Sequence, residues 1–123
     1  MLSIEEKGKD IIKQAIEVGA SDVHFHPKEK GTLIQFRVDH RLYDAMWIPM
    51  TISEKLLSHF KFLSGMDIGE KRRPQNGAMD MVLYPRRLHL RLSTIPTSYN
   101  ESLVVRILPQ DETHTYEMNK QLN

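Results

Sequence analysis

Two arginine residues, Arg91 and Arg106, are the side chains of this sequence that are best suited to bind an anion. Each lies among apolar residues that predict a β-strand, and the two are fifteen positions apart. A guanidinium group keeps its charge at any physiological pH, and its planar fork matches the oxygens of a phosphate or a carboxylate. The sequence leaves the partner open: it is either an internal carboxylate, Asp80 or Glu101, or an anion from outside the chain.

The residues around the two arginines alternate in polarity, which predicts half-buried strands at 87–94 and 102–108. In the first of these strands, Arg91 faces away from three leucines, Leu88, Leu90 and Leu92. In the second, which we expect to be central, Arg106 has apolar side chains on its own face and on the opposite one. An arginine in such a place needs a negatively charged partner, because an unpaired buried charge is costly.

The sequence has no phosphate-binding loop of its own. Its one Gly-Lys pair, Gly8-Lys9, has Ser3 where such a loop needs its first glycine and Asp10 where it needs Ser or Thr. The pair also falls inside a predicted helix instead of between a strand and a helix. We therefore expect no catalytic residue in this chain and no hydrolysis of ATP by this chain alone.

The other polar residues do not have the spacing of a metal or catalytic site. His24 and His26 share one face of a predicted strand, but the other histidines are scattered, so packing or hydrogen bonding is favoured over metal binding. No two carboxylates are spaced as a general acid–base pair, and we interpret them as solvated or capping groups: Asp67, Glu70, Asp80 and Glu101. The basic run at 71–73 has no aromatic residues between its charges, which disfavours direct DNA or RNA binding.

Length and composition indicate one ordinary globular domain. The chain has 123 residues, 40% hydrophobic and 27% charged, with a formal net charge of +1. It contains no cysteine, which excludes disulfides and thiolate metal sites. Its apolar runs are far shorter than the ~20 residues that span a bilayer, and the N-terminus has no signal-peptide core.

Hydrophobic periodicity predicts the order helix, three strands, helix, three strands. The helices are expected at 2–19, with a capping box of Ser3 and Glu6, and from Thr51 to just before Gly65, with a capping box of Thr51 and Glu54. The remaining strands are expected at 22–26, 32–38, 41–48 and 79–84. This order predicts an α+β fold with a mostly antiparallel sheet and two packed helices over 1–109, followed by a linker or disordered tail at 110–123.

Four segments in this order resemble the N-terminal half of the secretion traffic ATPases, which drive type II secretion and type IV pilus assembly. They are ASDVHFHP at 20–27, FRVD at 36–39, EKRRPQNG at 70–77, and the stretch from LRLSTIPT at 90–97 through Glu101 to Arg106. The run HFKFLSGMDIGE from His59 is most similar to the competence pseudopilus ATPase of the comG operon in Gram-positive bacteria.

The resemblance implies a PAS-like N-terminal domain of a hexameric ATPase whose Walker motifs lie in a C-terminal RecA-like domain. In this family, arginines that match Arg91 and Arg106 close over the nucleotide, ATP with Mg²⁺, that the RecA-like domain holds. Arg72 matches a further arginine, in the loop before Pro-Gln, with a phosphate or interface role. The implied partners are the chain's own RecA-like domain, neighbouring subunits of a homo-hexamer and an inner-membrane platform protein, without direct DNA binding. The implied location is the cytoplasm, at the inner face of the cell membrane.

The sequence departs from the family pattern at four positions. His40 and Asn100 stand where glycine is usual, Asn76 where aspartate is usual, and Ala78 where arginine is usual. Because Ala78 replaces the arginine that usually ends the basic loop at 70–77, this loop is less suited to provide a second anion contact. The change does not affect the two strand arginines, Arg91 and Arg106. Two other functions stay open: a stand-alone PAS-like sensor of a small ligand, and a module that only binds other proteins.

Overall fold

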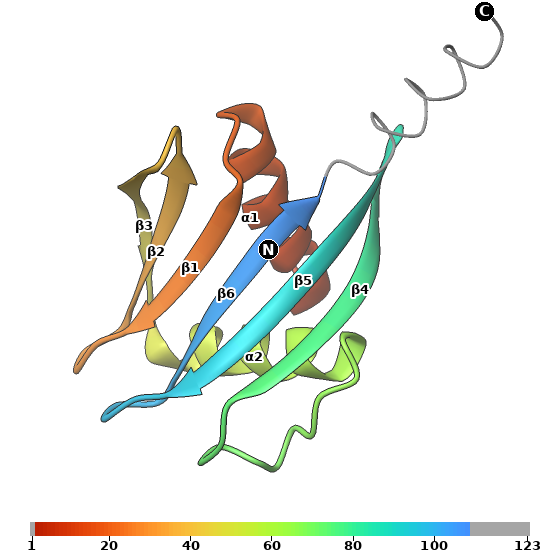
Figure 1. Cartoon of the computed structure of the whole chain (residues 1–123). Coiled ribbons are helices and arrows are strands. Elements are labelled where there is room, and N and C mark those ends of the chain that lie inside the picture. The colour runs from red at the N-terminus through yellow and green to blue at the C-terminus, as the bar shows by residue number, and fades with distance from the viewer. Residues whose placement is uncertain (1, 109–123) are drawn as a thin grey trace, which may run out of the picture.

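In the computed structural model, which describes residues 2–108, two helices pack on one face of an antiparallel sheet (Figure 1). The predicted α+β fold is confirmed. The elements in chain order are α1 (Ile4–Glu17), β1 (Asp22–Pro27), β2 (Thr32–Val38), β3 (Arg41–Ile48), α2 (Met50–Leu63), β4 (Gln75–Leu83), β5 (Arg86–Pro96) and β6 (Glu101–Leu108). No helix within residues 2–108 is both long and apolar enough to cross a membrane.

The strands of this sheet follow the order β3-β2-β1-β6-β5-β4. The last strand, β6, therefore lies between β1 and β5 and joins the two halves of the chain. This position confirms that Arg106 belongs to an interior strand. It also brings β1, from the start of the chain, next to the strand that carries Arg106.

The hydrophobic core lies between the helices and the sheet face that they cover. Alternate residues of the inner strands point into it and are less than 2% exposed, including Phe25, Ile34, Leu90, Leu92, Leu103 and Val105. The helices contact each other where Gly8 of α1 meets Phe60 of α2, and a Cβ atom at Gly8 would lie 3.3 Å from the Phe60 ring. Because one face of the sheet is buried in this way, the strand register determines which polar side chains reach the open face.

The two predicted capping boxes have different outcomes. At α1, the Ser3 hydroxyl accepts a hydrogen bond from the Glu6 amide at 3.1 Å, and the Glu6 carboxylate accepts one from the Ser3 amide at 3.1 Å. At α2, the prediction was wrong, because the helix begins at Met50 and its N-cap is Pro49, which has no capping side chain. Pro49 holds the N-cap position with an extended backbone, φ −62° and ψ 150°, so Thr51 lies inside the first turn and does not act as a cap.

Most element boundaries agree with the sequence, and the exceptions follow from strand pairing. Strand β4 begins at Gln75, earlier than expected, because it pairs with β5 along its whole length from Gln75 opposite Thr94 to Leu83 opposite Arg86. The last residues of the expected basic loop therefore belong to the sheet. The expected strands 32–38 and 41–48 leave two residues between them, Asp39 and His40, and these form the hairpin turn, with φ angles of 49° and 68°. The predicted tail at 110–123 lies outside the described residues.

Candidate anion-binding site on the open face of the sheet

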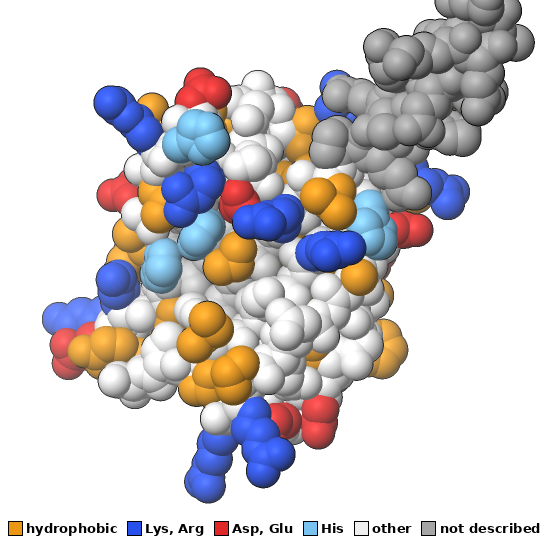
Figure 2. Space-filling model, in the orientation of Figure 1, with side chains coloured by type: hydrophobic (Ala, Val, Ile, Leu, Met, Phe, Trp, Pro, Cys, Tyr) orange, Lys and Arg blue, Asp and Glu red, His pale blue; other side chains and the backbone are white. Residues whose placement is uncertain are grey.

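The sheet face without helices carries a concentration of basic side chains. Figure 2 shows this face, where Lys, Arg and His side chains gather over one part of the sheet with few acidic groups between them. The strand register identifies the centre of the group. Arg91 on β5 lies directly opposite Arg106 on β6, Arg106 lies opposite Asp22 on β1, and Asp22 lies opposite Arg37 on β2. Three arginines and one carboxylate thus form a row across four neighbouring strands.

A groove of about 640 Å³ runs beside the two paired arginines. Its walls include Arg91, Arg106 and the side chains of His89, Ser93, Val104 and Asn76. The Ser93 hydroxyl donates to the Asn76 side-chain oxygen at 2.9 Å, and the Nδ1 atom of His89 lies 2.8 Å from the Asp80 carboxylate. The groove is therefore polar and open to solvent, as expected for a surface that receives an ionic group and not for an apolar ligand.

Arg106 is exposed at its tip and attached at its base. Its side chain is 66% exposed, and its Nε atom donates a hydrogen bond of 3.1 Å to the Asp22 carboxylate. That carboxylate is only 5% exposed and also accepts a hydrogen bond of 2.7 Å from the Ser21 hydroxyl. Burial by itself would raise the pKa of Asp22, but the hydrogen bonds from Ser21 and Arg106 and the charge of Arg106 outweigh it and lower that pKa below its ordinary value.

The internal carboxylates that the sequence suggested as partners for the arginines are both engaged elsewhere. Asp80 contacts His89, and Glu101 forms an ion pair with Lys61, so neither of the two named carboxylates is the partner. The alternative of an internal carboxylate holds for Arg106, but with a different residue. The carboxylate next to Arg106 is Asp22, which is 84 positions away in the sequence. Sequence patterns give no signal for this contact, because it depends on β6 pairing with the first strand of the chain.

Arg91 has no such anchor. Its side chain is exposed, and within residues 2–108 it takes part in no hydrogen bond or ion pair with another side chain. Directly opposite residues of antiparallel strands have Cβ atoms roughly 4.5–5.5 Å apart, and like charges at such positions repel each other. The repulsion between Arg91 and Arg106 therefore makes the folded state less stable than it would be with an uncharged side chain at one of the two positions. An anion bound between the two guanidinium groups would offset this repulsion.

Arg72, the third arginine named from the sequence, lies away from this pair. It belongs to the loop between α2 and β4, and it is not among the residues that line the groove. The loop is braced internally: the Arg72 amide donates to the Glu70 carboxylate at 2.8 Å, and the Gln75 side chain donates to the carbonyl oxygens of Asp67 and Glu70 at 2.9 and 3.1 Å. The structure therefore brings Arg91 and Arg106 together and places Arg72 elsewhere on the surface.

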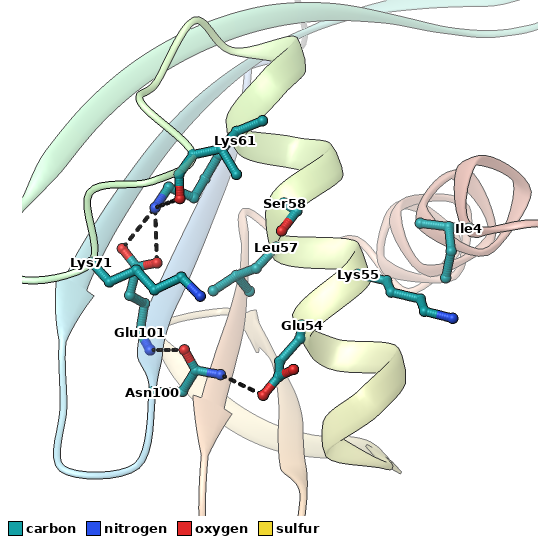
Figure 3. A pocket seen from close by; sticks show the side chains of 10 residues that line it. Ile4, Glu54, Lys55, Leu57, Ser58, Lys61, Lys71, Asn100 and Glu101 are labelled. Carbon is teal, nitrogen blue, oxygen red and sulfur yellow. Dashed lines mark hydrogen bonds and ion pairs between the residues drawn. The ribbon is translucent and has the colours of Figure 1, made fainter.

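A buried ion pair on the helix side of the sheet holds the same loop in place. Lys61 and Glu101 have side chains only 2% and 3% exposed, and the Lys61 Nζ atom lies 2.8 Å from the Glu101 carboxylate and 2.8 Å from the Glu70 carbonyl oxygen. Figure 3 shows this pair beside a pocket of about 400 Å³ between α2, the loop and the start of β6. Sequence reasoning missed the pair, although Lys61 follows Leu57 by one helical turn on the buried face of α2.

His24 and His26 lie on the open face of β1, near the basic row. Their ring centroids are 5.6 Å apart. Burial lowers the pKa of both, and it is reinforced by the positive charges of His26 and Arg37 near His24 and of Lys28 near His26. Within residues 2–108, no group of three metal-ligating side chains includes them. The lowered pKa values favour the neutral form of both rings beside the arginines.

Comparison with known proteins places this chain in a group of bacterial secretion and pilus proteins. A family described as type II/IV secretion system protein matches residues 2–122. The competence protein ComGA of Bacillus subtilis is 48% identical over 110 residues, which are 89% of this chain and 31% of that protein. The type IV pilus assembly ATPase PilB of Pseudomonas aeruginosa is 35% identical over 99 residues, which are 80% of this chain and 18% of that protein. The chain therefore spans about a third or less of the length of these relatives.

One solved structure, the pilus retraction motor PilT with bound ADP, shares the fold, with a TM-score of 0.50 and 18% sequence identity. The match covers 81% of this chain and 28% of that one. The family match and the relatives confirm the resemblance to the N-terminal domain of the traffic ATPases that the four sequence segments indicated. This chain belongs to the type II/IV secretion system protein family.

Proposed function

We propose that this chain is the N-terminal domain of a secretion-type ATPase that powers pseudopilus assembly for DNA uptake. In this proposal, Arg91 and Arg106 contact the phosphates of ATP held by a RecA-like domain of the full-length protein. The observation that carries the proposal is the direct pairing of two exposed arginines on neighbouring strands, with one buried carboxylate beside only one of them. Such a pair has unmatched positive charge and a geometry that suits a polyphosphate.

The relatives support the chemical class of the ligand. PilB of Pseudomonas aeruginosa and the type II secretion system ATPase E of Vibrio cholerae are described as ATPases, and the second is 37% identical over 103 residues. The similarity to ComGA, described as a competence protein, supports the role in DNA uptake. Because this chain covers a minor part of each relative, the activity of the whole protein is carried over as a proposal.

The arginine pair fits a nucleotide that another domain delivers. ATP with Mg²⁺ supplies a reactive phosphate whose negative charge spreads over its oxygens during transfer, and a guanidinium from outside the binding loop stabilises that charge. On the side of this chain, Arg91 and Arg106 bind the phosphate oxygens from the walls of the groove that they line. Because the contact exists only with nucleotide present, hydrolysis changes the orientation of one domain relative to the other.

The proposal extends to assembly and location. We infer a homo-hexamer, contact with an inner-membrane platform protein and a cytoplasmic position at the inner face of the membrane, all from the resemblance to the family. Arg72 remains a predicted contact to phosphate or to a neighbouring domain. Its place in a braced, exposed loop apart from the groove favours an interface over direct contact with the phosphate that Arg91 and Arg106 bind.

A stand-alone ligand sensor is the weaker alternative. The space that such a sensor would use is filled, because Ile34, Leu90 and Val105 are 0% exposed and Phe36 is 6% exposed. A module that only binds proteins has some support from two exposed apolar residues at the ends of α1, Leu2 and Val18, which are 48% and 55% exposed. They lie at opposite ends of the helix and form no continuous patch, so the motor function is favoured.

The test is the ATPase rate of the full-length protein with Arg91→Ala or Arg106→Ala. We expect each rate to fall on the order of 10-fold or more, because arginines that contact a transferring phosphate contribute large factors to the rate. Arg41→Ala is the matched control, since Arg41 is an exposed arginine on the edge strand β3, outside the groove. Rates equal to wild type in both groove variants contradict the proposal.

A further inference from the structure

The two arginines of the pair differ in how they are held. Arg106 donates from its Nε atom to Asp22, whereas Arg91 has no side-chain partner within residues 2–108. The Nε atom lies at the base of the guanidinium fork, so this bond leaves the two terminal nitrogens with four N–H groups for a ligand. Arg106 is therefore restricted in direction while its binding end stays available.

The carboxylate that holds Arg106 is itself fixed from several sides. Its second oxygen accepts the Ser21 hydroxyl at 2.7 Å and lies 3.9 Å from the Nε atom of Arg37. The backbone of Ser21, just before β1, bonds to the two strands that flank β1: its amide donates to the Arg37 carbonyl oxygen of β2, and its carbonyl oxygen accepts from the Ile107 amide of β6, both at 2.9 Å. The Asp22 side chain thus sits in a rigid position beneath an exposed guanidinium.

The charge balance shows that Asp22 does not neutralise the site. It lies between Arg37 and Arg106 in the row across the sheet and is shared by both. A phosphate approaching the groove meets the exposed guanidinium groups first, while the carboxylate is 5% exposed beneath them. The arrangement orients one arginine and leaves the net charge of the row positive.

We propose that Asp22 is a positioning residue that aims Arg106, and not Arg91, at the phosphate. This inference rests on the proposed function. A side chain that is already ordered before binding loses less freedom when the ligand arrives, so its loss weakens binding and reaction without removing a direct contact. Asp22 acts through Arg106 and does not touch the nucleotide.

The functional test is a double-mutant cycle in the full-length protein with Asp22→Asn, Arg106→Ala and the double variant, measured as kcat and KM for ATP. We expect Asp22→Asn to lower kcat/KM several-fold in the wild-type background and to have no further effect when Arg106 is already alanine. An equal loss in both backgrounds overturns the inference, since it means that Asp22 acts through something other than Arg106. An unchanged kcat/KM for Asp22→Asn also overturns it.

A second measurement distinguishes this inference from the proposed function. The Nε–H signal of Arg106 in the NMR spectrum of the chain reports the anchor directly, and we expect Asp22→Asn to shift it and to speed its exchange with water. Asp44→Asn is the matched control, a carboxylate on the edge strand β3 that accepts from Gln35. A signal unaffected by Asp22→Asn overturns the anchor, whatever the ATPase result. If the anchor is present but Arg91→Ala and Arg106→Ala both keep wild-type ATPase rates, the proposed function fails, and the positioning role with it.

A milder variant keeps the test valid if Asp22→Asn does not fold. Ser21→Ala removes one hydrogen bond to the carboxylate from an exposed residue. We expect Ser21→Ala to lower kcat/KM for ATP in the wild-type background, by less than Asp22→Asn does, and to have no effect in the Arg106→Ala background. A loss of equal size in both backgrounds overturns the inference here as well.

Discussion

The two faces of the sheet carry two pairs of charged residues that are built in opposite ways. On the helix side, Lys61 and Glu101 are buried, oppositely charged and 2.8 Å apart, with further hydrogen bonds to the loop before β4. On the open side, Arg91 and Arg106 are exposed, equally charged and directly opposite each other. The first pair is balanced within the fold, whereas the second has two positive charges with one carboxylate, Asp22, beside only one of them. The charges of Lys61 and Glu101 stabilise the fold, whereas those of Arg91 and Arg106 are exposed to a ligand.

The helix-side pair gives the largest expected effect on stability. Lys61→Met leaves the Glu101 carboxylate buried without its partner, and we expect the free energy of unfolding to fall by about 3–5 kcal/mol. Chemical denaturation of the chain measures this value, with the exposed Lys55→Met on the same helix as the matched control. The double variant Lys61→Met with Glu101→Gln should recover part of the loss, because no full charge is then left buried. A loss below about 1 kcal/mol for Lys61→Met contradicts the structural role of the pair.

The two arginines of the open face should differ from each other in stability. Arg106→Ala removes a donor from the buried Asp22 carboxylate, and we expect a loss of about 1–3 kcal/mol. Arg91→Ala removes only an exposed charge opposite a like charge, and we expect a change within about 0.5 kcal/mol, in the stabilising direction. Both values come from the same denaturation experiment. A large loss for Arg91→Ala shows that its side chain has a structural partner and removes the contrast between the two.

The smallest expected effect concerns pH. His24 and His26 have pKa values lowered below the ordinary 6.5, mainly by burial, so the folded protein binds fewer protons there than the unfolded chain. The contribution of the two neutral histidines to the free energy of unfolding is therefore fully present above pH ~6.5. It is lost as the pH falls from there through their lowered pKa values. Urea midpoints measured between pH 7.5 and 5 should fall in wild type and fall less in a variant with His24→Gln and His26→Gln. The same dependence in both proteins contradicts this assignment.

Much of the open face was predictable from local patterns. Alternation along β5 and β6 placed Arg91 and Arg106 on the face opposite the apolar core residues, and the structure agrees. The expected burial of Arg106 was wrong, because no helix of residues 2–108 covers the open face (Figure 1) and its side chain there is 66% exposed. The fold class followed from the order of helices and strands. These features depend on neighbours in the sequence, where period-two and period-3.6 patterns carry the information.

The contacts that define the site were not predictable in the same way. That Arg91 stands directly opposite Arg106 depends on the register set by the turn between β5 and β6, and the Asp22 contact depends on a strand pairing between residues 84 positions apart. Lys61 is the one charged residue on the buried face of α2, a signal that indicates a buried charge but not its partner. The capping box predicted at Thr51 was wrong because the motif considers only Thr51 and Glu54, whereas the helix starts after the N-cap residue Pro49, two positions before Thr51.

In the proposed function, the two guanidinium groups on the open face meet a phosphate that another domain brings. A structure of the full-length protein with a non-hydrolysable ATP analogue tests it most directly. We predict nitrogen atoms of Arg91 and Arg106 within about 2.7–3.2 Å of phosphate oxygens. A nucleotide bound with both arginines remote from it would contradict the account.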